Sequence, residues 1–118
     1  YLMDRFVVQK VNLLEDKINS QFELARFKLF EEQINGGIQE TCITTDKNGV
    51  PWGSGLNNGM EINISLDILQ TLSRYYGVTA PVWIDNAEAV TKPLEIESQT
   101  IKLVVDPDYP EMEAEYHE

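Results

Sequence analysis

The chain has 118 residues and a mass of 13.5 kDa, enough for one domain at most, because a single core usually takes ~100–200 residues. Its formal net charge of −11 argues against direct contact with a phosphate backbone, since nucleic-acid-binding proteins present basic patches. Cys42 is the only cysteine and His117 the only histidine, which excludes an internal disulfide and argues against a zinc or iron cluster. No run approaches the ~18 apolar residues of a membrane span. We therefore expect a cytoplasmic protein that does not contact a membrane.

Residues 1–34 are predicted to form one long helix. They contain no proline or glycine, and Val7, Val11, Leu14 and Ile18 recur at alternating four- and three-residue steps. This spacing is typical of a coiled-coil seam. An amphipathic helix packed on its own core is the alternative. Because the pattern is already under way at the first residue, we expect a piece of a longer protein whose coiled coil enters a globular head.

A β-hairpin is predicted after this helix. Asn35-Gly36-Gly37 should end the helix, because glycine tolerates the left-handed conformation that follows a helix end. Residues 38–45 are rich in β-branched side chains and predict a strand. A turn at residues 46–49 and a return through residues 50–52 would complete the hairpin.

A central helix and two strands are predicted in the remainder. Residues 60–76 carry a broad apolar face and are followed by Gly77, which indicates a helix covered on several sides. Residues 82–84 and 100–105 are apolar runs typical of parallel strands buried on both faces. The acidic residues 106–118 predict a solvated tail or a last short helix. The expected fold is therefore α/β, with loops gathered at the carboxyl ends of parallel strands, where such sheets bind ligands.

Two segments have residues suited to chemistry. Asp85 ends the apolar run 82–84, as in nucleotide triphosphatases whose buried strand presents a carboxylate to Mg²⁺. An aspartate that only caps the following turn is the alternative. The polar loop before the central helix ends in Asn57, Asn58 and Gly59, and the free N–H groups and dipole of a helix start favour an anion such as phosphate. Simple capping of the helix by Asn58 is the alternative here.

In order and spacing these motifs resemble the C-terminal lobe of the SMC/SbcC-type ABC ATPases, in the compact versions found in phages and prophages. The segment LNNGMEIN, residues 56–63, is similar to the signature loop LSGGE. PVWIDNAEAV, residues 81–90, is similar to the Walker B strand, and IKLVVDP, residues 101–107, to the next core strand. The resemblance begins at about residue 20 and covers most of the chain.

The resemblance implies half of an ABC-type ATPase head. Residues 1–34 would be the helix that enters from the coiled coil, residues 35–105 the lobe with the signature loop and Walker B strand, and residues 106–118 an acidic tail. No GxxxxGK[ST] loop is present, so the P-loop that holds the β- and γ-phosphates would come from a separate N-terminal lobe.

The resemblance also implies site residues and cofactors. ATP and Mg²⁺ would bind in the complete head, with Asp85 orienting the metal and Asn57, Asn58 and Gly59 contacting the nucleotide. In most of the family a glutamate follows the Walker B aspartate and activates water, whereas Asn86 stands there and the nearest carboxylate is Glu88. Asp106-Pro107 also stands where a histidine is usual. ATP-dependent dimerisation is therefore easier to infer than turnover.

The expected function is that of an ATPase-head lobe that supplies the signature loop and Walker B carboxylate for ATP-dependent dimerisation in DNA repair, recombination or chromosome maintenance. Its partners would be the missing P-loop lobe and a second copy, with DNA contacted only through the full assembly, and the isolated chain would be inactive. Two other classes stay open. One is an acidic protein–protein interaction module without nucleotide chemistry, and the other is a metal-dependent hydrolase that uses Asp85, Glu88 and Asp106.

Overall fold

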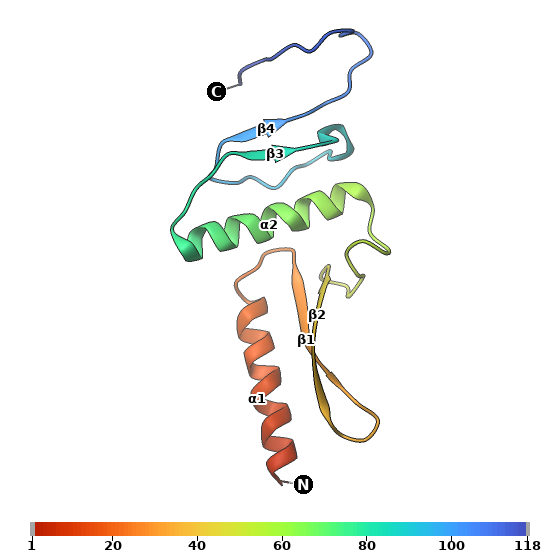
Figure 1. Ribbon diagram of the computed structural model, residues 1–118, viewed down its shortest axis with the longest axis vertical. Helices are drawn as coiled ribbons and strands as arrows, with labels where there is room; N and C mark the ends of the chain where they lie inside the picture. The colour runs from red at the N-terminus through yellow and green to blue at the C-terminus, as the bar shows by residue number, and fades with distance from the viewer. Residues whose placement is uncertain (1, 118) are drawn as a thin grey trace.

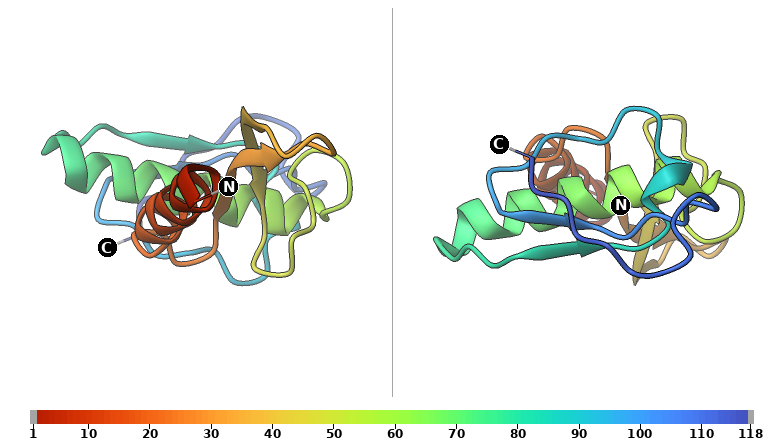
Figure 2. Two further views of the ribbon diagram at one scale, coloured as in Figure 1. Left: turned by 90° about the horizontal axis from the view of Figure 1, so that it is seen from below. Right: turned by 90° about the horizontal axis from the view of Figure 1, so that it is seen from above.

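The computed structural model describes residues 2–117 and extends over 66 × 31 × 18 Å. Helix α2, Asn58–Tyr76, crosses the middle of the molecule (Figure 1). On one side of α2 lies an arm built from helix α1, Leu2–Asn19, and the antiparallel strands β1, Arg26–Glu32, and β2, Ile38–Thr45. Seen from below, α1 is nearly end-on in front of α2, so the arm points away from the central helix (Figure 2).

The second side of α2 carries strand β3, Val82–Ile84, the short 3₁₀ helix η1, Ala87–Ala89, and strand β4, Thr100–Lys102. β3 and β4 pair in parallel, which confirms the expected strand direction. Residues 103–117 contain no helix or strand. The protein is thus a small mixed α/β fold with two α-helices and two two-stranded sheets among the described residues.

The predicted helix over residues 1–34 is wrong beyond Asn19. Arg26–Glu32 forms a strand because its backbone pairs with β2, from Arg26 opposite Thr45 to Glu32 opposite Ile38, with a shift in register between Lys28 and Phe30. The glycines expected to end a helix instead form the hairpin turn, where Gly36 has φ of 79°. The sequence between α1 and this turn is compatible with helix locally, and the long ladder with β2 decides for strand.

Helix α1 packs along the outer edge of β1. The side chain of Asn19 bonds both backbone groups of Phe27, donating to its carbonyl at 2.9 Å and accepting from its N–H at 2.7 Å. Glu15 Oε2 accepts from the N–H of Leu29 at 2.8 Å. These contacts satisfy groups that a free strand edge would expose. Within the described residues α1 therefore packs on a strand. The residues of the predicted coiled-coil seam differ in exposure, since Val7 is 46% exposed while Ile18 is half-buried.

The turn after β2 forms as predicted, but the return strand hardly exists. Asp46 N–H donates to the carbonyl of Val50 at 3.0 Å, and Gly49 has the left-handed φ of 82° that such a turn needs. The return is limited to a single bridge between Thr45 and Pro51. The partner of β2 is therefore β1.

The core is small and lies around α2. Only four apolar residues are buried among those described: Ala25, Ile64, Leu66 and Ile84. The expectation that β3 is buried on both faces is wrong for this chain, since Trp83 is 65% exposed while Ile84 is 6% exposed. Successive strand residues point to opposite faces. One face of the β3–β4 sheet is consequently covered and the other is open. β4 also ends at Lys102, three residues earlier than predicted.

Candidate functional site

Asp85 stands at the carboxyl end of β3, where the sequence places it. Its side chain is exposed, and Oδ1 accepts a hydrogen bond from the N–H of Asn86 at 2.9 Å. Asn86 adopts a left-handed conformation, with φ of 55° and ψ of 40°, which turns the chain into η1. One carboxylate oxygen thus bonds the N–H of the next residue, whereas the N-cap position of η1 is Asn86, which makes no side-chain cap bond. The carboxylate is still accessible to solvent.

Glu88 lies on η1 and is exposed. The segment is held in place by its backbone: the N–H of Ala87 donates to the carbonyl of Leu103 at 3.0 Å, and the N–H of Ala89 donates to that of Asn86 at 3.0 Å. The carboxylates of Asp85 and Glu88 are therefore carried on one short, anchored turn after β3.

The loop before α2 is capped by Asn57 and not by Asn58. Asn57 has an extended backbone, and its Oδ1 accepts from the N–H of Met60 at 2.9 Å. Its carbonyl accepts from the N–H of Glu61 at 3.1 Å. Asn58 is the exposed first residue of the helix. The N–H groups of Asn58 and Gly59 have no partner within residues 2–117, so they are the first-turn donors that an anion would meet.

Glu61 holds the start of the same loop, a role that the motif comparison missed. Its Oε1 accepts from the N–H of Gly53 at 2.9 Å, and its carbonyl accepts from Trp52 Nε1 at 3.3 Å. A carboxylate in the first turn of a helix is favoured by the helix dipole, and this position is the signal that marks Glu61 in the sequence. Glu61 and Asn57 together close the loop at both ends.

Gly59 joins the two candidate segments. A Cβ atom on this residue would lie 2.7 Å from the carbonyl oxygen of Ala89, so the first turn of α2 packs against the backbone of η1 with no room for a side chain. The structure thus brings Gly59 together with the turn that carries Asp85 and Glu88. It also gives this glycine a packing role that is independent of any phosphate.

The side chains present could supply only a minority of the ligands of a Mg²⁺ ion. No group of three or more metal-ligating side chains forms within residues 2–117, so Asp85, Glu88 and Asp106 do not make a protein-only metal centre. Mg²⁺ usually keeps several waters and takes one or two carboxylates together with substrate phosphates. The exposed Asp85 carboxylate suits that kind of site.

No helix between residues 2 and 117 is long and apolar enough to cross a membrane. Comparison of the chain with protein-family models, with curated proteins and with solved structures finds no match.

Proposed function

We propose that this chain is the C-terminal lobe of an SMC/SbcC-type ATPase head, which completes a nucleotide site together with a separate P-loop lobe. The observation that carries the proposal is that the start of α2, which follows the polar loop, packs against the turn that carries the carboxylate at the end of β3. Gly59 in the first turn of α2 packs on η1, directly after the turn with Asp85. The proposed work of the complete head is ATP-dependent dimerisation in DNA repair, recombination or chromosome maintenance.

The open sheet supports the need for a second lobe. Parallel sheets are normally covered on both faces and have more than two strands. Here two parallel strands of three residues each form the whole sheet, and Trp83 stands 65% exposed on its open face. Beyond β4, Val104 and Val105 are 57% and 82% exposed. Further strands and a covering helix from another lobe would bury these side chains.

The total surface supports the same conclusion. The chain exposes 9507 Å², whereas a folded monomer of this mass typically exposes about 6,500 Å². The difference of about 3,000 Å² exceeds the ~800 Å² that each partner contributes to a standard protein–protein interface. One lobe-sized partner, or a lobe and a second copy, would account for it.

The proposed roles follow from the positions of the side chains. The N–H groups of Asn58 and Gly59 and the side-chain amide of Asn57 would contact the phosphates of ATP held by the opposite P-loop. Asp85 would orient Mg²⁺, which would neutralise phosphate charge when bound. Asn86 or Glu88 would position the attacking water, and their exposure leaves either side chain free to reach it.

The test joins this chain to a P-loop lobe, taken from the gene sequence upstream, and measures phosphate release and ATP-driven dimerisation together. Asp85→Ala should abolish both, and Asp108→Ala in the exposed tail is the matched control. Glu88→Gln should lower turnover by ~10²–10⁴ but keep dimerisation if Glu88 is the general base. If Asn86 holds the water, Asn86→Ala should show that phenotype and Glu88→Gln should be nearly silent. Full activity of Asp85→Ala would refute the Walker B assignment.

The isolated chain offers a second test. It should not bind ATP–Mg²⁺ tightly, because its phosphate contacts are completed only by the other lobe. Calorimetric titration that gave a low-micromolar dissociation constant, about −8 kcal/mol, would contradict the two-lobe proposal.

An acidic interaction module is the second candidate function. Residues 106–117 favour it, because their acidic side chains alternate with exposed apolar ones such as Tyr109, Met112 and Tyr116. A parent gene without any P-loop, together with unaltered partner binding in Asp85→Ala, would place this function first.

A further inference from the structure

Asp67 on α2 binds the backbone of the segment that connects α1 to β1. Its side chain is only 4% exposed. Oδ1 accepts from the N–H of Glu23 at 3.1 Å, and Oδ2 accepts from the N–H groups of Leu24 at 2.6 Å and Ala25 at 2.8 Å. Three consecutive backbone donors therefore converge on one buried carboxylate. Hydrogen bonds to a charged acceptor are roughly twice as strong as neutral ones.

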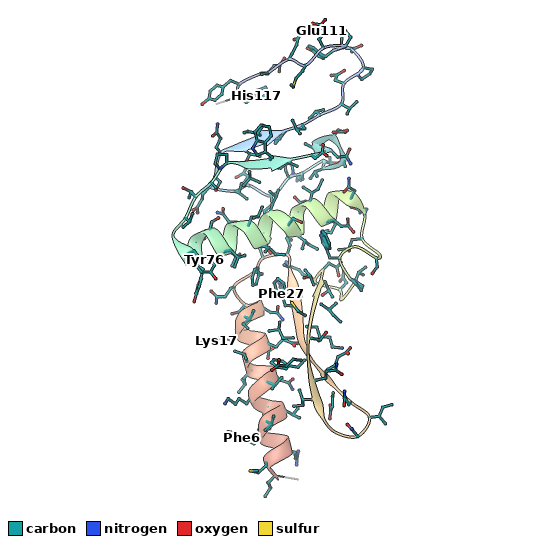
Figure 3. The ribbon with its side chains drawn as sticks, viewed as in Figure 1. Phe6, Lys17, Phe27, Tyr76, Glu111 and His117 are labelled. Atoms are coloured by element: carbon teal, nitrogen blue, oxygen red, sulfur yellow. The ribbon has the colours of Figure 1, made fainter. Side chains whose placement is uncertain are left out.

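The same segment lies between two regular elements and has no ladder of its own. α1 ends at Asn19 and β1 begins at Arg26, so residues 20–25 must be fixed by other contacts. Phe22 packs edge-on against Phe27, with ring centroids 4.9 Å apart. Phe27 lies at the base of the arm next to α2 (Figure 3). Ala25 is completely buried. These contacts make the root of the arm a tight joint.

α2 holds its opposite neighbour with different side chains. Asn63 donates to the carbonyl of Lys92 at 3.0 Å and accepts from the N–H of Leu94 at 2.8 Å. Gln70 Oε1 accepts from the N–H of Glu97 at 3.1 Å. Asn63 and Gln70 are seven residues apart and share one helix face. The arm and the segment that leads to β4 are thus fastened to α2 independently.

We propose that Asp67 is the joint that fixes the direction of the arm relative to α2, and that residues 20–25 are a hinge that opens when this carboxylate is lost. With the joint intact, a displacement of α2 carries the arm with it. With the joint broken, the arm stays tied to α2 only through the bonds of Glu61 to Trp52 and Gly53 and of Thr71 to Gln21, so its direction relative to α2 varies more widely. This device belongs to the chain itself and goes beyond the proposed function, because no nucleotide or second lobe takes part in it.

Asp67→Asn tests the joint, because asparagine keeps the size of the side chain but replaces one acceptor oxygen with a donor. Spin labels on Cys42, the exposed cysteine of β2, and on Tyr75→Cys at the exposed end of α2 report the arm-to-helix distance. The distance distribution should be narrow in the labelled parent and broad in Asp67→Asn. Gln70→Ala removes the contact on the other side of α2 and should leave the distribution narrow.

Amide exchange in the unsubstituted chain provides a measurement that does not depend on whether the variant folds. In the unsubstituted chain the amides of Glu23, Leu24 and Ala25 should open together and more slowly than those of the hairpin turn. In Asp67→Asn they should exchange about tenfold faster or more, as expected when bonds to a charged acceptor are lost, with α2 amides unchanged. An equally narrow distance distribution in Asp67→Asn, or independent and fast exchange of the three amides in the parent, would overturn the proposal.

Discussion

Replacing Gly59 by alanine tests the contact that joins the two candidate segments. The added Cβ would lie 2.7 Å from the carbonyl oxygen of Ala89 and 3.6 Å from its carbonyl carbon, and real Cβ atoms essentially never approach within 3.0 Å. The atom that it meets belongs to the backbone, so no side-chain rotation relieves the clash. The first turn of α2 and η1 must move apart.

Two opposing effects set the size of the change. Alanine is more favourable than glycine within a helix by about 1 kcal/mol, and by less in the first turn. Overpacking of a close contact costs about 1–3 kcal/mol. The clash therefore wins, and we expect Gly59→Ala to lower the free energy of unfolding by about 1 kcal/mol.

Urea unfolding followed by far-ultraviolet circular dichroism measures this difference. Asn58→Ala is the matched control, since it places alanine on the neighbouring exposed position, where only the helix preference acts. We expect Asn58→Ala to be neutral or slightly stabilising. If Gly59→Ala stabilised the chain as much as Asn58→Ala, the close packing of α2 on η1 would be refuted.

Three further outcomes concern the turn after β2, the cap of α2 and self-association. The hydrogen bond from the N–H of Val50 is the main cause that holds the pKa of the Asp46 carboxyl below its ordinary value of 3.8. The ionised carboxylate therefore stabilises the turn fully above about pH 4, and this stabilisation is lost as the pH falls through the lower pKa of the folded state. Nuclear magnetic resonance of the turn amides should show this loss at low pH, and Asp46→Asn should remove the pH dependence. The same pH profile in Asp46→Asn as in the parent chain would contradict the assignment. Asn57→Ala removes the cap of α2 and should lower stability by about 1 kcal/mol in urea unfolding, whereas an unchanged midpoint would argue against the capping bond. Sedimentation at increasing concentration should show dimers or larger species, because an open sheet edge and exposed apolar surface favour self-association. A strict monomer at millimolar concentration would count against self-association.

Local sequence was enough to predict the elements whose causes are local. α2 lies within two residues of its predicted start, because a polar cap, a broad apolar face and Gly77 all act within the helix itself. The β2 strand and the turn at residues 46–49 follow from β-branched side chains and from glycine at a left-handed position. The position of Asp85 at a strand end also follows from the short apolar run before it.

Tertiary structure decided the root of the arm and the roles inside the candidate site. Residues 26–32 become a strand because β2 pairs with one edge and the side chains of α1 satisfy the other, and neither partner is visible in their own periodicity. The backbone donors that bind Asp67 lie 42 to 44 residues away, so its only sequence signal was an acidic residue in an apolar helix. Gly59 fits a phosphate loop by sequence, yet its contact with Ala89 exists only once α2 packs on η1. Periodicity and caps indicate the local shape of the backbone. The partner of a buried polar group, or the residue against which a glycine packs, comes from a distant segment that only folding brings near.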